Sequence, residues 1–471
     1  VACGIFRHLE NLHMTTRWAE QTLWGWGRHP RVTSEVTRPE RRAEVFAALE
    51  DREGKPILAH ALGRCYGDAA LLRDGRVVLT RRLDRMIDFD AETGWLRVEG
   101  GVSLEQIIQT FVPRGFFPTV VPGTQFVSVG GALACDIHGK NHHVDGCFSD
   151  HVRNVELLTA SGTVVMCDAE QNPALFWATV GGMGLTGLVL AMDLRLVPIA
   201  NAFIEMESIR VDDLDAFFAV SEESRDFTHT VSWIDCVKTG KHLGRGIFMR
   251  GRHAPPGTTG KSSLLQRVGG VVPGLLNVPV DGPDWLLNAA SITAFNETYF
   301  RSHPKGKVER VVHYEPFFFP LDNVRNWNRL YGGRGFLQYQ FVVPPDPQNR
   351  TVREVLTLIA ESGMASFLAV IKEFGAQRHG GLSFPQPGVT LALDFGHAGA
   401  PLLDLLHRLD RLVLDAGGRV YLGKDARLPR PVFEQMYPEA AAWKHVRDEW
   451  DPNNVFQSEL GRRLGLCGGG S

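Results

Sequence analysis

Four glycine-rich segments in the first half of the chain restrict its fold more than any other feature. They read ALGRCYGDAA (61–70), VPGTQFVSVGGALA (121–134), DIHGKNHHVDG (136–146) and TVGGMGLTG (179–187). Glycine lets the backbone approach a ligand closely and present N–H groups to a pyrophosphate. One such segment is an ordinary turn, whereas four together indicate a large anionic cofactor enclosed by backbone.

Known phosphate and metal motifs do not account for these segments. None contains the GxxxxGK[ST] pattern, and no acidic residue follows GGMGLTG at the distance that a dinucleotide fingerprint requires. The titratable groups of ACDIHGKNHH (134–143) could bind a metal, act as acids and bases, or line a cofactor. His138 and His142 have the spacing of a zinc-binding helix, but Gly139 disfavours a helix and no HExxH or CxxC is present. We therefore predict no metal site, and expect His142 and His143 to make structural hydrogen bonds within the loop.

Length and composition exclude several classes of protein. A chain of 471 residues is too long for one hydrophobic core, so two domains are expected. The net charge of -3, without long runs of one sign, argues against nucleic acid as a partner. Seven scattered cysteines without a CxxC pair argue against a disulfide framework and a structural zinc site, and fit a reducing compartment. No stretch approaches the roughly 20 apolar residues of a membrane span.

The two ends are left out of the fold prediction. Residues 1–13 lack the features of a signal peptide, and Met14 is a candidate start. The tail CGGGS resembles a flexible end. We expect a cytoplasmic protein, or one bound peripherally at the inner membrane.

The first half mixes strands, glycine loops and helices. Strands are predicted at 85–90 and 95–101, and a hairpin at 152–168. Between them, Ser103 and Gln106 form a capping box for a helix that Gly115 can close.

The second half predicts an antiparallel sheet with covering helices, of α+β type. Strand-like runs occur at 203–210, 229–237, 246–250, 335–343, 366–374 and 388–395, and amphipathic helices near 350–362 and 400–416. The stretch 254–291 predicts a long irregular loop with many apolar residues.

Three of these strands place polar residues on one face. Gln338 and Gln340 alternate with apolar neighbours, Lys372 lies on one face of its strand, and Thr390 aligns with Asp394. A solvated sheet face would explain the pattern. A polar pocket floor explains it equally well, because the face carries little charge.

The chain resembles the decaprenylphosphoryl-β-D-ribose 2-oxidases, flavoproteins of the vanillyl-alcohol-oxidase (PCMH) type that act in cell-wall arabinan synthesis. The resemblance extends from about Trp26 to Leu464 and rests on LGRCYGD, VPGTQFVSVGGALACDIHGKNHH, LFWATVGGMGLTG, GFLQYQF, LSFPQPG and YLGKDAR. It implies a two-domain PCMH-type FAD-binding fold with an antiparallel-sheet substrate domain. The implied parts are an FAD domain over 14–200, a substrate domain over 201–419, and a segment 420–466 that returns to the FAD domain.

The resemblance implies FAD as the cofactor. Tyr66 stands where many relatives carry the histidine that tethers FAD, so the flavin is expected to be non-covalent. The implied cofactor-binding residues are Trp26, Gly63, Arg64, Cys65, Tyr66, Gly67, Asp68, Pro122, Gly123, Thr124, Val127, Gly130, Gly131, Cys135, His138, Gly139, Gly182, Gly184, Gly187, Leu188 and Tyr421.

Flavin-dependent alcohol oxidation needs a group that takes the hydroxyl proton, and a carbinol held against the flavin. The resemblance implies His138 and Lys424 as the catalytic candidates and does not decide between them. The implied substrate residues are Lys140, Trp233, Phe318, Arg329, Gln338, Gln340, Lys372, Phe374, Thr390 and Ala392. Ala392 stands where relatives carry the cysteine that nitroaromatic inhibitors attack, so we expect this chain to escape such adducts.

The resemblance implies oxidation of a polyprenyl-phosphoryl-β-D-ribose at its 2-hydroxyl. A separate short-chain NAD(P)H-dependent keto-reductase is the implied partner, and the apolar stretch 265–291 a peripheral membrane contact. Family analogy also allows a periplasmic location. The alternatives are a soluble sugar-alcohol or aldonolactone oxidase, and a non-catalytic lipid-sugar binding protein.

Overall fold

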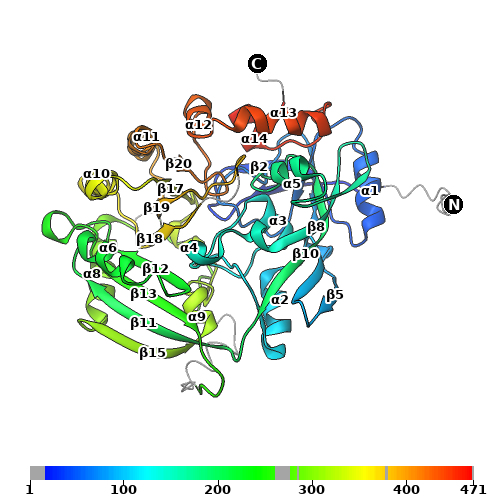
Figure 1. Ribbon diagram of the computed structural model, residues 1–471. Helices are drawn as coiled ribbons and strands as arrows, with labels where there is room; N and C mark the ends of the chain where they lie inside the picture. Colours follow the sequence, from blue (N-terminus) through cyan, green and yellow to red (C-terminus); the bar gives the residue numbers. More distant parts are fainter. Residues whose placement is uncertain (1–15, 260–275, 284–285, 377–379, 469–471) are drawn as a thin grey trace.

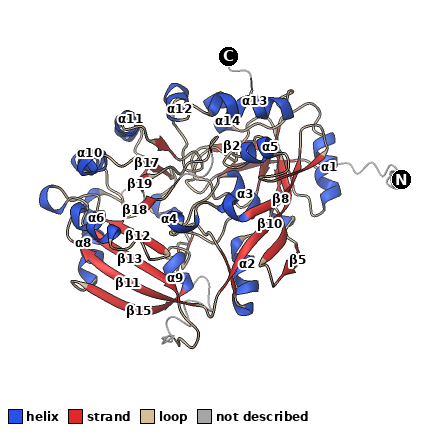
Figure 2. Cartoon of the chain, viewed as in Figure 1, coloured by secondary structure: helices blue, strands red, loops and turns tan. Residues whose placement is uncertain are grey.

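The computed structural model describes residues 16–259, 276–283, 286–376 and 380–468 (Figure 1). The expected extension before Met14 and much of the expected apolar loop lie outside these residues. Strands gather in two regions with helices around them, as Figure 2 shows. The fold is a mixture of helices with largely antiparallel sheets, as predicted.

Two sheets form the part of the molecule built from the first 200 residues. The first has the order β1 (Ala19–Trp24), β2 (Arg31–Thr37), β4 (Arg76–Leu79), β3 (Ile57–His60), beside α1 (Arg42–Glu50). The second has the order β5 (Met86–Asp90), β6 (Trp95–Glu99), β10 (Leu188–Pro198), β8 (Val152–Leu158), β9 (Val164–Cys167), with β7 (Phe116–Pro118) paired to β10. The helices here are α2 (Leu104–Phe111), α3 (Val129–Ala134), α4 (His142–Asp145) and α5 (Pro173–Thr179).

Local sequence signals predict this region well. The strands at 85–90 and 95–101 and the hairpin over 152–168 are confirmed. In α2, Ser103 accepts from the Gln106 N–H while the Gln106 side chain accepts from the Ser103 N–H, so the capping box is confirmed. Gly115, at φ 82°, ends the following turn, as glycine alone does without strain.

An antiparallel sheet of eight strands dominates the rest of the chain. Its order is β15 (Lys307–His313), β11 (Phe203–Val211), β13 (Gly246–His253), β12 (His229–Ile234), β18 (Ala369–Phe374), β19 (Gly388–Gly396), β17 (Phe336–Val343), β20 (Arg419–Val420). Helices α6 (Leu214–Glu222), α10 (Arg350–Ser362) and α11 (Ala400–Asp415) pack on one face, where the Tyr339 hydroxyl donates to Asp410 of α11. The other face of the sheet is therefore left for a cavity.

The described residues from 276 to 330 contain secondary structure that the sequence analysis did not predict. They include β14 (Leu276–Asn277), α8 (Ala289–Ser302), α9 (Tyr314–Phe318) and β16 (Val324–Arg325). The amide cap of Asn288 accepts from the N–H groups of Ala290 and Ser291 and starts α8. The sequence prediction missed α8 because glycine and proline before it obscured the helical period.

The C-terminal segment runs back along the first part of the chain (Figure 1). It carries α12 (Arg430–Met436), α13 (Ala440–Trp450) and α14 (Glu459–Leu464). The Ile57 N–H donates to the Val455 carbonyl at 2.8 Å, and Arg463 pairs with Asp68 at 2.9 Å. Among the described residues, no helix is both long and apolar enough to cross a membrane.

Candidate active site

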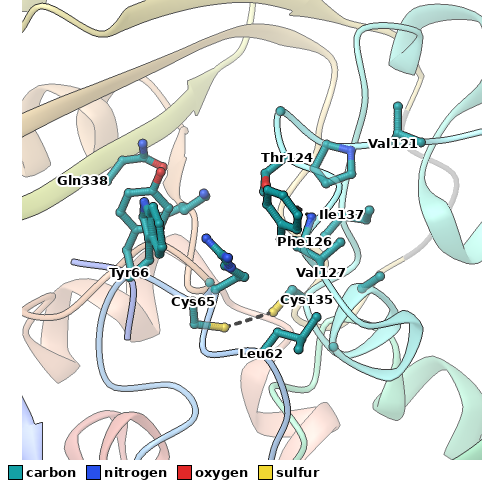
Figure 3. A pocket seen from close by; sticks show the side chains of 18 of the residues that line it. Leu62, Cys65, Tyr66, Val121, Thr124, Phe126, Val127, Cys135, Ile137 and Gln338 are labelled. Atoms are coloured by element: carbon teal, nitrogen blue, oxygen red, sulfur yellow. Dashed lines mark hydrogen bonds between the residues drawn. The ribbon is translucent and has the colours of Figure 1, made fainter. Parts of the chain in front are cut away.

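A cavity of about 1000 Å³ lies where the glycine-rich segments meet the face of the eight-stranded sheet opposite α10 and α11. Figure 3 shows Tyr66 and Gln338 on one side of it, with Thr124, Phe126 and Val127 across from them. Residues 421–424, after β20, supply a third part of the wall. Segments far apart in sequence thus converge on one space large enough for a cofactor and a substrate.

The polar face of the sheet is a cavity wall and not a solvated surface. Gln338, Gln340 and Thr390 are nearly fully buried, and they line the cavity with Lys372. Gln338 donates through its amide nitrogen to the buried carboxyl of Asp394. The prediction of a polar pocket floor is therefore confirmed.

His138 lies on the wall and is held by its neighbours. The amide nitrogen of Gln340 lies 3.0 Å from His138 Nε2, and the rings of Phe374 and Tyr421 are 4.8 and 5.3 Å away. Burial, followed by the charge of Lys372, lowers the pKa of His138 well below its usual value. The ring is therefore neutral at neutral pH. With Gln340 donating to Nε2, the ring proton sits on Nδ1, which is buried without a hydrogen-bond partner.

Three partly buried lysines line the same cavity. Burial lowers the pKa of Lys140 and Lys424 to about 8, and that of Lys372 to about 7. Lys140 donates to the Phe318 carbonyl, and the Lys424 ammonium lies 3.8 Å from the Tyr66 ring centroid. Burying three amines in one cavity is costly unless an anion joins them. The site is therefore suited to a negatively charged ligand.

The wall residues fit an FAD molecule. A Cβ added at Gly123 or Gly184 would meet nothing within 4 Å, so at both points backbone faces open cavity. Arg64 has a buried Nε without a partner, and its guanidinium lies 4.1 Å from the Trp26 ring. Exposed backbone and an unsatisfied arginine nitrogen are what a dinucleotide would use.

Most predicted site residues meet at this cavity. Those on its wall are Trp26, Gly63, Arg64, Cys65, Tyr66, Pro122, Gly123, Thr124, Val127, Gly130, Gly131, Cys135, His138, Gly139, Lys140, Gly184, Gly187, Leu188, Trp233, Gln338, Gln340, Lys372, Thr390, Ala392, Tyr421 and Lys424. Their individual roles stay predictions.

Six predicted residues lie off the wall. Asp68 pairs with Arg463, Arg329 pairs with Asp281 at 3.1 Å, and Phe374 packs edge-on against His138. Gly67 and Gly182 allow close backbone packing, since a Cβ would come within 2.0 Å of Asp425 O and 2.2 Å of Ala178 O respectively. Phe318 is buried in the core, and its carbonyl accepts a hydrogen bond from Lys140 at 3.0 Å.

The side chains of His142 and His143 reach partners far from their own loop in sequence. His142 accepts from the Gly375 N–H at 3.2 Å, and His143 Nε2 lies 2.8 Å from the Phe227 carbonyl. The expectation of structural bonding holds, but these partners lie next to β18 and β12 of the eight-stranded sheet and not within the loop. A short helix, α4, begins at His142 despite the preceding glycine.

Sequence reasoning missed two groups of wall residues. Asp322 accepts from the Gln125 N–H at 2.8 Å, and burial raises its pKa to about 6. It therefore ties the segment after α9 to the glycine loop at 121–134. The second group is Met249, Phe295, Tyr299 and Phe367, which form an apolar end of the cavity together with the predicted Trp233. Phe295 and Tyr299 lie on the unpredicted helix α8. Sequence analysis missed them because no local pattern shows that a residue lines the end of a cavity.

Comparison with known proteins agrees with this geometry. A family model described as an FAD binding domain matches residues 33–168. The chain is 37% identical over 94% of its length to a decaprenylphosphoryl-β-D-ribose oxidase of Mycolicibacterium smegmatis, covering 97% of that protein. It is 33% identical over 78% of its length to an uncharacterized protein of Streptomyces coelicolor, covering all of that protein. It is 26% identical over 37% of its length to an L-gulonolactone oxidase of Bos taurus, covering 39% of that protein.

The extent of the first match shows the family, because it spans both the glycine loops and the eight-stranded sheet. FAD is the cofactor, and the protein is an FAD-dependent oxidoreductase. The chain belongs to the decaprenylphosphoryl-β-D-ribose oxidase family.

Proposed function

We propose that this protein uses FAD to oxidise the 2-hydroxyl of a polyprenyl-phosphoryl-β-D-ribose to a ketone. The observation that carries the proposal is the combination of environments in one cavity: glycine-rich backbone, buried amines and an apolar aromatic end. Such a substrate needs flavin at its carbinol, cations at its phosphodiester and apolar surface at its lipid. A free alditol or aldonolactone would need only the flavin at its carbinol.

In the proposed reaction, bound FAD supplies the hydride acceptor. The protein must remove the hydroxyl proton and hold the carbinol in place. We assign removal of the hydroxyl proton to Lys424. Its pKa of about 8 means that a fraction of the molecules carry a neutral Lys424 amine at neutral pH. His138 is the weaker base because Gln340 occupies Nε2 and burial keeps the ring neutral. Its free Nδ1–H is suited to donate to a ligand oxygen.

The remaining amines suit the phosphodiester. Lys140 and Lys372 are buried on the cavity wall, and a diester anion would offset the cost of burying them. Beyond them, Trp233 and Tyr299 pack edge to face with ring centroids 4.8 Å apart. These aromatic rings are suited to the first isoprene units of the lipid.

The chemistry of the product implies a second enzyme. A 2-keto sugar carries no stereochemistry at that carbon, so hydride return to the opposite face completes an epimerisation. We propose a separate short-chain NAD(P)H-dependent keto-reductase as the partner, giving the arabinose configuration. Peripheral contact with the membrane that carries the lipid substrate completes the proposal.

Anaerobic flavin reduction tests the function directly. Purified protein containing FAD is mixed with polyprenyl-phosphoryl-ribose, free ribose, alditols or an aldonolactone, and flavin absorbance is followed. We expect the lipid-linked sugar to bleach the flavin fastest. Faster bleaching by an alditol or aldonolactone would favour a soluble sugar oxidase. If the protein contains stoichiometric flavin and none of the sugars reduces it, the protein would have only a binding role.

The flavin is expected to be released when the protein is denatured. Burial, followed by the charge of Asp394, raises the pKa of Tyr66 well above its usual value, so its phenol stays neutral and a poor nucleophile. After precipitation with trichloroacetic acid, all flavin absorbance should remain in the supernatant. A fluorescent protein band on a denaturing gel would contradict this.

Ala392→Cys is expected to create a target for nitroaromatic inhibitors. Ala392 lies on β19 opposite Gln340 and lines the cavity. After turnover with such an inhibitor, peptide mass spectrometry should find one adduct at position 392 in the variant. The unsubstituted protein should carry none on a cavity cysteine, and an adduct there would refute the expectation.

Phe295→Ser should weaken binding of long-chain substrates selectively. Phe295 is 48% exposed at the apolar end and stacks on Tyr299 with centroids 6.0 Å apart. Losing this half-buried ring should raise KM for a long polyprenyl substrate about tenfold. A short-chain analogue should be unaffected. Ile87→Ser, an exposed apolar residue on β5 off the cavity wall, is the control. Equal effects on both substrates would place the lipid elsewhere.

A further inference from the structure

Two cysteines from distant segments meet on the cavity wall. Cys65 belongs to the LGRCYGD segment and Cys135 follows α3, yet their sulfurs lie 3.6 Å apart (Figure 3). Both line the cavity, and Cys65 is partly exposed there. The sequence prediction, which relied on spacing, did not anticipate this pair because the two residues are 70 positions apart.

Backbone hydrogen bonds hold both cysteines in place. The Cys65 carbonyl accepts from the Trp26 N–H at 2.7 Å, and the Cys135 N–H donates to Gly131 O at 3.0 Å. The Tyr421 hydroxyl donates to the Cys135 carbonyl at 2.8 Å. The sulfurs are in van der Waals contact, and a disulfide of about 2.05 Å requires that they approach further by about 1.5 Å.

The pKa values of the two thiols are shifted in opposite directions, as a reactive pair requires. The hydrogen bond with Cys135, and then the charge of Lys424, lower the pKa of Cys65 against the opposing effect of burial. The pKa of Cys135 is raised by the same pairing and by burial. Oxidation-sensitive cysteines are typically accessible thiolates next to a second, resolving thiol. Cys65 fits the first role, and Cys135 fits the second.

We propose that Cys65 and Cys135 form a dithiol that hydrogen peroxide oxidises reversibly to a disulfide on the cavity wall. The Cys65 thiolate attacks one peroxide oxygen, the O–O bond breaks, and water leaves once the second oxygen is protonated. The Cys135 sulfur then attacks the Cys65 sulfenic acid; the S–S bond forms and the second water leaves with the Cys135 proton. Overall, two thiols and one peroxide give one disulfide and two waters, and two electrons pass from sulfur to oxygen.

Peroxide is the expected oxidant at this place. A reduced flavin that passes two electrons to dioxygen releases hydrogen peroxide inside the same cavity. Without a resolving thiol, repeated oxidation would carry Cys65 to sulfinic acid, which is not readily reversed. The pair therefore protects the cofactor site and lets a thiol reductant restore it. This inference depends on the two sulfurs and not on the identity of the sugar.

The test treats the FAD-containing protein with hydrogen peroxide, blocks remaining thiols by alkylation, and maps peptides without reduction. We expect a peptide joining Cys65 to Cys135, a loss of two thiols per chain, and recovery of both with dithiothreitol. Two unmodified thiols at these positions, or a disulfide to another cysteine, would overturn the proposal.

Three variants separate the pair from general oxidation. In Cys135→Ser, the same peroxide dose should carry Cys65 to sulfenic and sulfinic acid, with no linked peptide. In Cys65→Ser, Cys135 should stay a thiol because its thiolate is disfavoured. Cys167→Ser removes a buried cysteine that is off the cavity wall, and should form the linked peptide as the unsubstituted protein does. Equal sulfinic acid at Cys65 with and without Cys135 would contradict the resolving role.

Discussion

Lys424→Met should lower the rate of substrate-dependent flavin reduction by a factor of about 10² to 10⁴, the usual contribution of a positioned acid or base. The methionine side chain keeps the contact with Tyr66, over which the Lys424 ammonium lies at 3.8 Å, but it cannot accept a proton. Stopped-flow absorbance under anaerobic conditions measures the rate. FAD content, measured in the same samples, separates lost chemistry from lost cofactor.

The pH dependence provides an independent check on the same residue. The neutral amine of Lys424 is the active form, so the rate should rise with pH through about 8 and then level off. Lys140 also titrates near 8, and Lys372 and Asp394 titrate near 7, so the limb near 8 is assigned to Lys424 by its loss in Lys424→Met. The control is Lys241→Met, an exposed lysine that should leave rate and profile unchanged. An unaltered limb in Lys424→Met would show that another cavity group, such as Lys140, takes the proton, because the pKa of His138 is lowered well below its usual value.

Sequence patterns predicted the elements whose signals are local. Three such elements depend on neighbouring residues, and all are present: the cap at Ser103, the hairpin over 152–168 and the helix over 350–362. The polar alternation of Gln338 and Gln340 predicted a pocket face because successive side chains of a strand point to opposite faces, which is also a local property. The family resemblance identified flavin as the cofactor, because no local sequence pattern does so.

The missed features depend on contacts between distant segments. Nothing near Asp322 in sequence reveals that it accepts the Gln125 N–H, and nothing near Cys65 reveals Cys135. Helix α8 was missed because its neighbours are rich in glycine and proline, although its face completes the apolar end of the cavity. Tertiary packing, and not propensity, decides these features.

Arg447→Met should destabilise the protein by about 3–5 kcal/mol, because it leaves a buried carboxylate without its counter-charge. Arg447 lies on α13 and is fully buried, as is Asp451, with 3.0 Å between them. Its guanidinium also donates to the Phe456 carbonyl at 2.8 Å and to the Asn454 side chain at 2.6 Å. The Leu185 carbonyl, at 3.4 Å, connects this network to the glycine segment 179–187.

Urea unfolding followed by tryptophan fluorescence measures the effect, with FAD removed from all samples so that cofactor binding does not shift the midpoint. Arg430→Met is the matched control: its pair with Glu434, at 2.7 Å, is about half exposed and should contribute less than about 0.5 kcal/mol. Arg447→Lys should fall between the two, since it keeps the charge but loses the forked donors. If Arg447→Met unfolds at the same urea concentration as Arg430→Met, the buried Arg447 network contributes no net stability beyond that of an exposed ion pair. The large loss is expected because the network joins residues from α13, the turn after it and the FAD-side glycine loop, which no single apolar contact connects.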